Sequence, residues 1–188
     1  MSHKLIIKYF ALILMGSGLS SCTGSSTTPQ TLNDLSKRVI KTLIDNDINS
    51  HMNLYAIPED MDYLTEQKYK YIDRKYANRP EARARWRRKR KNRAEKWKSL
   101  RHKFNEKAKV AFSKTRSTLI KNNFDLNNMQ AEPMPFTRIK YMYEKYKLEF
   151  GTHKILLRSN KQQTTLAISR VLKTNRGWVI TSNIILEK

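Results

Sequence analysis

Beyond residue 30, apolar side chains recur every three or four positions until about residue 122, and this spacing predicts helices. The stripes predict four of them, over residues 31–44, 48–55, 58–76 and 80–122. Thr31 is typical of an N-cap, because its hydroxyl can accept a hydrogen bond from a free amide of the first turn. Pro58 and Pro80 suit first turns, since proline lacks the N–H that would go unpaired there. We therefore expect the first part of the chain to be helical.

The fourth of these helices changes character along its length. Its second half keeps an apolar stripe through Leu100, Phe104 and Ala108, so we expect that half to pack on the core. In the first half, Arg90 and Arg93 occupy positions of the same stripe, so we expect it to leave the core and project. Like charges repel along a helix, and this half should be frayed or extended unless an anionic partner neutralises it.

After about residue 138 the period changes to two, which predicts strands. The expected strands cover residues 139–150, 154–158, 164–168 and 178–186, with Gly151-Thr152 and 174–177 as turns. Four such strands in sequence form a meander whose inner face needs cover, and the preceding helices can supply it. The expected fold class is α+β, with N-terminal helices, including one long basic helix, packed on a C-terminal four-stranded antiparallel meander.

Residues 1–22 have the pattern of a secretion signal. A short positive start precedes an apolar run over residues 9–15. Seven residues rise only about 10 Å as a helix, too little to span a bilayer of about 30 Å. The run ends in Leu19-Ser20-Ser21-Cys22, which contains the only cysteine of the chain.

That tetrapeptide resembles the bacterial lipoprotein signal, which is an aliphatic residue, two small residues and a cysteine. The resemblance implies cleavage before Cys22 and acylation of its thiol with chains such as palmitate. Two or three acyl chains anchor a protein firmly, since each buried CH₂ contributes about 0.8 kcal/mol. Residues 23–30 are small, polar and uncharged, which favours a flexible tether before a single domain over 31–188. Thr23 resembles the sorting residue of outer-membrane lipoproteins, which implies a bacterial cell-envelope location facing the periplasm.

Charge is concentrated in one segment of the 188-residue chain, whose formal net charge is +22. Residues 66–121 hold 22 basic and 5 acidic side chains and form a strongly basic helical segment. Its densest part lies within residues 83–91 and is the predicted anionic-surface binding site: Arg83, Arg85, Trp86, Arg87, Arg88, Lys89, Arg90 and Lys91.

This basic segment has four possible interpretations, and the first is binding to an anionic envelope surface. Beside a membrane, each Lys or Arg contributes about 1 kcal/mol of attraction to anionic lipid, and lipopolysaccharide or acidic glycans offer similar charge. Phosphate contacts with nucleic acid are an alternative, with Trp86 and the tyrosines at 69, 71 and 76 available for stacking, but export from the cytosol ranks it lower. A specific acidic protein partner is a third reading. A solvated, charge-rich helix without a partner is the fourth.

A second resemblance rests on 34–47, which is an amphipathic helix ending in an acidic turn, and on the closing segment Gly177-Trp178-Val179-Ile180. Both resemble parts of secreted domains of the nuclear-transport-factor-2-like (NTF2-like) or cystatin-like kind. The resemblance implies a helix lying across a curved sheet and leaves a small-ligand pocket or an enzyme as an alternative function. The basic segment departs from that pattern, and no catalytic residue can be carried over.

The residues offer little support for metal binding, catalysis or a cofactor. His3, His51, His102 and His153 are scattered, and a lipidated Cys22 is no nucleophile, so we expect no metal site, catalytic residue or cofactor. The sequence contains no Gly-rich phosphate loop and no Gly-x-Ser-x-Gly elbow. Nothing in the pattern indicates an oligomeric state. A non-catalytic binding module is therefore the expected function.

Overall fold

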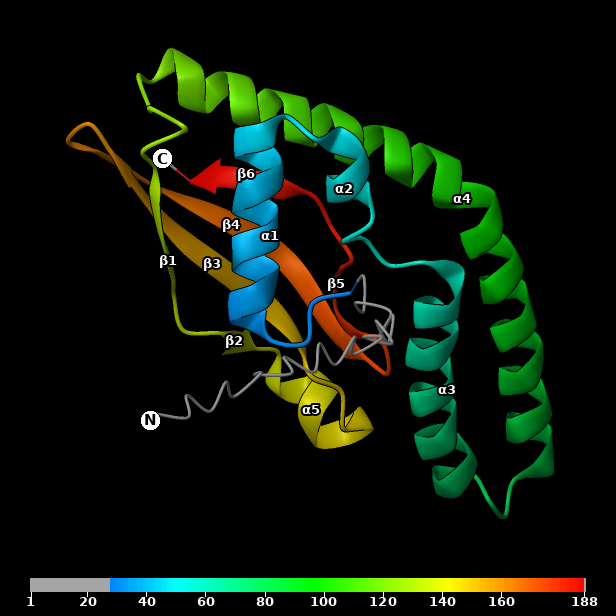
Figure 1. Cartoon of the computed structure of the whole chain (residues 1–188). Coiled ribbons are helices and arrows are strands. Elements are labelled where there is room, and N and C mark those ends of the chain that lie inside the picture. The colour runs from blue at the N-terminus through cyan, green and yellow to red at the C-terminus, as the bar shows by residue number, and fades with distance from the viewer. Residues whose placement is uncertain (1–27, 188) are drawn as a thin grey trace, which may run out of the picture.

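The computed structural model describes residues 28–187, and for residues 90, 93 and 94 the backbone alone. Helices precede and flank an antiparallel sheet, so the predicted α+β class is confirmed (Figure 1). The helices are α1 (Leu32–Asp45), α2 (Ile48–Met52), α3 (Pro58–Lys75), α4 (Pro80–Lys121) and α5 (Lys140–Tyr146). The strands are β1 (Gln130–Pro133), β2 (Thr137–Arg138), β3 (Phe150–Ser159), β4 (Gln162–Thr174), β5 (Gly177–Ile180) and β6 (Ile184–Glu187).

Helix α1 forms where the apolar stripe predicts it and lies across one face of the sheet (Figure 1). Thr31 Oγ1 accepts a hydrogen bond from the Asp34 amide at 3.0 Å and so caps the first turn. Leu35 and Leu43 have no exposed surface, because they face the core on the inner side of the sheet. Asn46 ends the helix in the left-handed conformation with φ at 56°, which asparagine tolerates better than most residues.

The sheet is built on the long hairpin of β3 and β4, in which Ile155 lies opposite Leu166. β5 and β6 pair with successive parts of β4, so together they follow the course of the expected last strand. A bulge divides that strand, because residues 181–183 span the stretch that Ser169 and Arg170 cover on β4. The expected meander is therefore correct for these strands.

The expected first strand of the meander, over residues 139–150, is wrong. The chain forms α5 instead, and the fourth position in the sheet is taken by β1 and β2, which pair with β3. Met142 is buried while Tyr141 and Tyr143 are 54% and 38% exposed, so the two tyrosines are not the inner face of a strand. So short an alternation does not separate strand from helix. Gly151, the expected turn, lies inside β3, where a Cβ would overlap the Thr137 carbonyl of β2.

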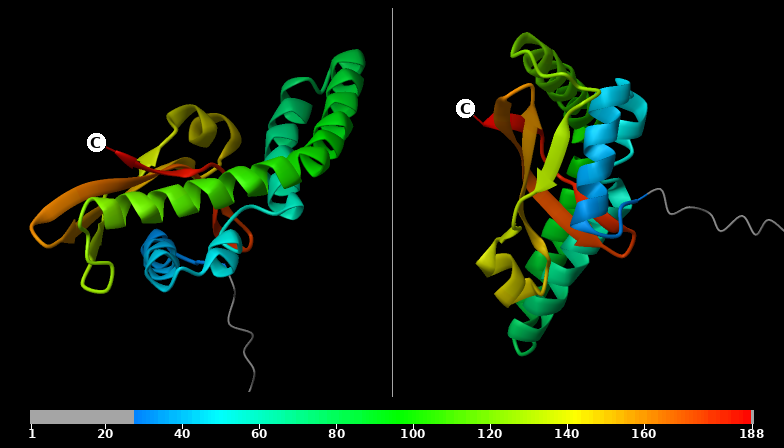
Figure 2. Two further views of the ribbon diagram at one scale, coloured as in Figure 1. Left: turned by 90° about the horizontal axis from the view of Figure 1, so that it is seen from above. Right: turned by 60° about the vertical axis from the view of Figure 1, so that its left-hand side comes forward.

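The second half of α4 packs along the β6 side of the sheet, as its apolar stripe predicts. Ala108, Phe112 and Leu119 are buried there in the same cluster as Leu35. The first half rises away from the sheet together with α3, and the two form a projecting helical hairpin (Figure 2). The expectation that this half projects is therefore confirmed.

The last residues of the expected tether belong to the fold. The Pro29 carbonyl accepts a hydrogen bond from the Trp178 amide at 2.7 Å, and Gln30 Nε2 donates to the Arg176 carbonyl at 2.8 Å. Thr28 is buried and accepts from Arg176 Nη1 at 3.2 Å. A Cβ at position 177 would overlap the Pro29 carbonyl, and φ there is +131°, which together explain why this position is glycine.

Candidate interface for anionic partners

The base of the α3–α4 hairpin is held by apolar side chains. Met61 and Leu64 of α3 face Trp97 and Leu100 of α4 around a hollow of about 270 Å³. The Trp97 ring lies 5.6 Å from that of Phe104, which continues the apolar stripe toward the core. Hydrophobic contact therefore fixes the direction in which the hairpin leaves the domain.

Farther from the sheet, polar pairs replace these apolar contacts. Arg83 Nε lies 2.6 Å from Asp73 Oδ1, and Arg87 Nε donates to the Tyr69 hydroxyl at 2.8 Å. The hydrogen bond from Arg83, together with the charge of Arg87, holds the pKa of Asp73 below its usual value. The expectation that this half is frayed or extended is wrong, because α3 itself supplies a carboxylate and a hydroxyl to two of the arginines.

The structure divides the predicted binding residues into two groups. Arg83 and Arg87 turn toward α3. The outward cations, as we call the second group, are exposed, and none of them forms an ion pair with an acidic residue of the described chain: Arg85, Arg88, Lys89 and Lys91. Trp86 is half-buried, with Lys89 Nζ 5.1 Å from the centre of its ring. Arg90 lies on the same helix, but its side chain is outside the described atoms. The hairpin therefore carries a group of exposed cations that no acidic side chain of the described chain neutralises.

Cys22, the predicted lipidation site, lies outside the described residues. Over residues 28–187, no helix combines the length and the apolar character needed to cross a bilayer.

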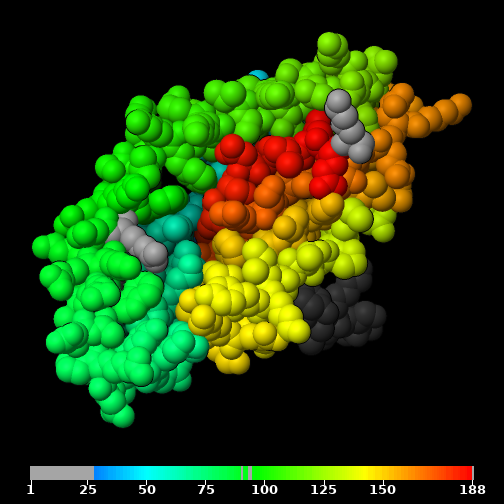
Figure 3. Space-filling view, turned by 180° about the vertical axis from the view of Figure 1, so that it is seen from behind, coloured from blue at the N-terminus to red at the C-terminus, as the bar shows by residue number. Residues whose placement is uncertain are grey.

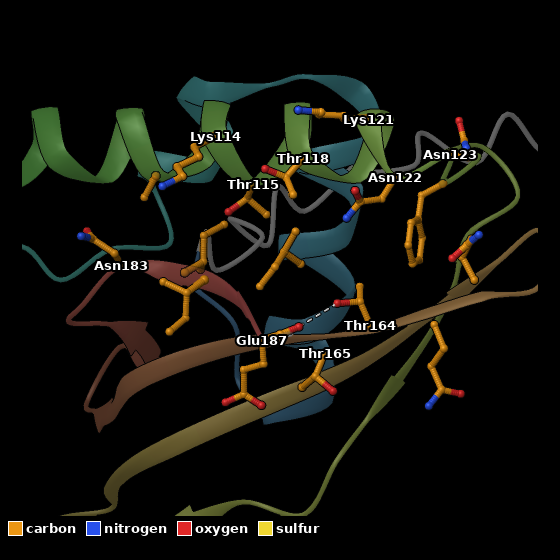
Figure 4. Close-up of a pocket in the computed structure, with 17 residues that line it drawn as sticks. Lys114, Thr115, Thr118, Lys121, Asn122, Asn123, Thr164, Thr165, Asn183 and Glu187 are labelled. Atoms are coloured by element: carbon orange, nitrogen blue, oxygen red, sulfur yellow. Dashed lines mark hydrogen bonds between the residues drawn. The ribbon is translucent and has the colours of Figure 1, made fainter.

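A polar cleft lies between the second half of α4 and strands β4 and β6, with a volume of about 1220 Å³ (Figure 4). Thr115 and Thr118 extend from α4 toward the strands, and Thr164 Oγ1 donates to the Glu187 carbonyl at 3.1 Å. Just over half of its lining residues have hydroxyl or amide side chains, and the charged ones are Lys114, Lys121 and Glu187. Such a lining can hydrogen-bond a polar molecule but contains no base paired with a nucleophile. Uncharged polar residues carry little sequence signal, so this cleft was not predicted.

The two histidines that the sequence leaves far apart are both buried beside α1. His51 Nδ1 lies 2.9 Å from Thr42 Oγ1, whose own proton goes to the Val39 carbonyl, so the imidazole is the donor. His153 Nε2 makes the same contact with Ser36 Oγ at 2.7 Å. Burial lowers the pKa of both rings, that of His51 to about 4. Both are therefore neutral core residues.

Metal-binding geometry is absent from the described part of the chain: no three His, Cys, Asp or Glu side chains lie close enough to share an ion. The arrangement that sequence reasoning missed is instead aromatic and cationic. Tyr71 of α3 meets Tyr146 of α5 edge to face at 5.4 Å, and Lys145 lies beside both rings. The segment that holds Tyr146 was predicted as a strand, and the prediction gave no reason to place it beside α3.

Comparison with known proteins adds no relative. No protein-family model, curated protein or solved structure matches this chain. The resemblances to bacterial lipoproteins and to NTF2-like or cystatin-like domains therefore remain predictions from the sequence.

Proposed function

We propose that this protein is a lipid-anchored component of a bacterial envelope whose α3–α4 hairpin docks on an anionic membrane surface. The observation that supports the proposal best is the set of outward cations, Arg85, Arg88, Lys89 and Lys91, exposed on a helix that leads away from the core. At about 1 kcal/mol for each cation near an anionic surface, the four contribute about 4 kcal/mol. That attraction falls off beyond a Debye length of about 8 Å, so the hairpin must lie close to the surface.

The predicted anchor would keep the hairpin within reach of the bilayer. The six residue steps from Cys22 to Thr28 span at most about 21 Å. Thr28 is fixed to the domain by Arg176, whose Nη2 also lies 2.5 Å from Asp60 Oδ2 in the first turn of α3. A lipidated Cys22 would therefore keep the base of the hairpin within about 21 Å of the anchor point. Because α3 is about 27 Å long, the outward cations would reach the surface when the hairpin lies along it.

Vesicle binding tests the hairpin without the anchor. The full chain with Cys22→Ala should co-sediment with phosphatidylglycerol vesicles, bind phosphatidylcholine vesicles weakly, and lose binding steeply as salt rises. Replacing all four outward cations by Gln should reduce the partition coefficient on the anionic vesicles by at least about a hundredfold.

The matched control removes four exposed lysines from the other half of the same helix: Lys103, Lys107, Lys114 and Lys121. This variant has the same net charge as the test variant but should keep most of the binding. Equal losses in the two variants would show that only overall charge matters and would overturn the hairpin as a docking surface. Binding to nucleic acid at about 0.15 M salt, with no binding to vesicles, would favour the alternative reading.

The anchor needs a test of its own. Mass spectrometry of protein extracted from membranes should find a chain that begins at Cys22 with acyl chains attached, and Cys22→Ala should remain unprocessed and unacylated. An intact Met1 and a free thiol would remove the envelope location from the proposal, whatever the vesicles show.

A further inference from the structure

A hollow of about 440 Å³ lies between the C-terminal end of α3 and α5, away from the outward cations. Its walls are Tyr71, Arg74 and Lys75 from α3, and Glu144, Lys145 and Lys147 from α5 and its end. On the face shown in Figure 3, α5 lies against the hairpin, which brings together cations that are about 70 residues apart in sequence. The volume is within the range of sites that take small molecules.

Lys145 is held in place by tyrosines. Its ammonium donates to the Tyr141 hydroxyl at 3.1 Å and lies 4.7 Å from the centre of that ring and 5.4 Å from the centre of the Tyr71 ring. The Tyr141 and Tyr146 hydroxyls lie 2.9 Å apart, which fixes the ring arrangement further. A lysine already ordered on aromatic rings loses less conformational freedom when it binds an anion.

The positive charge of the hollow exceeds what its helices need. Four cations face one carboxylate, Glu144, which itself lies 3.7 Å from Lys140 on the outer side of α5. Two helices end here, and each C-terminus carries about half a negative charge, which offsets only about one of the three net positive charges. The remaining charge favours an anionic ligand.

Lys147 occupies a backbone position that usually belongs to glycine. It ends α5 with φ at 56° and ψ at 36°, while the Leu148 amide returns to the Met142 carbonyl at 3.3 Å. A helix that closes in this way favours Gly, because a Cβ is disfavoured in the left-handed region. Lys161, in the turn between β3 and β4, is left-handed as well, so the backbone at Lys147 raises the cost of this lysine but does not by itself assign it a role.

We propose that this hollow binds a phosphomonoester, either free or as a lipid headgroup. A phosphate dianion presents three oxygens and nearly two charges, which suits a hollow lined by four cationic side chains, Arg74, Lys75, Lys145 and Lys147, better than a carboxylate does. The Lys75 and Lys147 ammonium groups lie over the Tyr76 and Tyr143 rings in the free protein, so they would turn toward the ligand on binding. Tyr71 offers its ring to the organic part of the ligand. The site belongs entirely to the described domain and does not depend on lipidation of Cys22 or on the docking of the hairpin.

Calorimetric titration of the full chain carrying Cys22→Ala with glucose 6-phosphate tests this site, with inorganic phosphate, glucose 6-sulfate and glucose as comparison ligands. We expect saturable binding of the two phosphates, and binding of the sulfate weaker by about tenfold because it carries a single charge. Vesicles with phosphatidic acid or with phosphatidylglycerol at matched surface charge identify the source. A preference for phosphatidic acid assigns a lipid headgroup, and binding of the soluble ligands without that preference assigns a free phosphomonoester. Equal binding of sulfate and phosphate, with no preference between the vesicles, would overturn the proposal.

Lys147→Gly separates a binding role from a structural one. Relief of the left-handed lysine should raise the melting temperature by about 3 °C, while glucose 6-phosphate binding weakens by about tenfold. Lys121→Gln, an exposed lysine at the end of α4, is the matched control and should leave the affinity unchanged. The four-Gln variant of the outward cations should also keep the affinity, so failure of the hairpin proposal and failure of this site are distinguishable. A Lys147→Gly protein that binds glucose 6-phosphate like the parent would contradict the role given to Lys147.

Discussion

The two halves of α4 belong to one continuous helix but are stabilised by different physical means. The second half buries Ala108, Phe112 and Leu119 against the sheet and α1. Much of the first half touches only α3, through Arg83 and Arg87, in pairs that stay partly exposed. Apolar burial gives a large, salt-independent contribution, whereas partly exposed ion pairs contribute little and weaken with salt. The comparison indicates that one continuous helix can cross from a buried apolar environment to a partly exposed polar one without a break.

The largest loss of stability should follow a substitution in the buried second half of α4. Phe112→Ala removes a buried ring that lies 4.6 Å from His51 and should lower the global free energy of unfolding by about 4 kcal/mol. Urea denaturation measures this value. Val110→Ala, on the same helix but 66% exposed, should change it by less than about 0.5 kcal/mol. If both variants unfold at the same urea concentration, the second half of α4 is not part of the core.

Low pH should destabilise the same part of the core, because His51 of α2 packs against Phe112 of α4. Burial lowers the pKa of His51 from 6.5 to about 4 in the folded chain. Between these pH values the unfolded state therefore binds a proton that the folded state does not bind. Its contribution to stability is present above pH 6.5 and is lost as the pH falls toward 4, at a cost of about 3 kcal/mol. His153 acts in the same direction. Urea midpoints measured between pH 7 and pH 4.5 should fall accordingly.

The control for this acid effect is His51→Gln, which lacks the titrating group. Its urea midpoint should depend less steeply on pH than that of the parent, even though the substitution itself lowers stability. A parent protein whose midpoint is flat over the same range would show that His51 is accessible to protons in the folded state.

The smallest predicted effect is a change in amide exchange within the α3–α4 hairpin. Asp73→Asn removes the charge that Arg83 faces and should speed amide exchange in the first half of α4 by about two- to threefold, with the core amides unchanged. Glu66→Gln on α3 breaks only an ion pair within that helix, with Lys70, and should alter exchange on α4 much less. If amide exchange rises equally in both halves of α4, the first half does not open separately from the core.

Particular residues show how far sequence reasoning reached. Thr31, Pro58 and Pro80 locate helix starts because capping and proline geometry are local. The strand predicted around Tyr141 is wrong, because a short alternation fits a helix equally well. The segment forms α5, which buries Met142 and leaves Tyr141 exposed. The sequence placed the outward cations in one predicted binding site with Arg83 and Arg87, and their separation from these two arginines required α3 to be in place.

Local sequence signals were enough to predict helices α1 to α4, the meander of β3, β4 and β5–β6, and the position of the charge, because periodicity, capping and composition act between near neighbours. No local signal indicated that α5 is a helix, which cations meet α3, how His51 and His153 are buried, or that Arg74 and Lys145 share one hollow. These outcomes depend on contacts between residues far apart in the chain, and such contacts exist only once the helices have packed on the sheet and on each other.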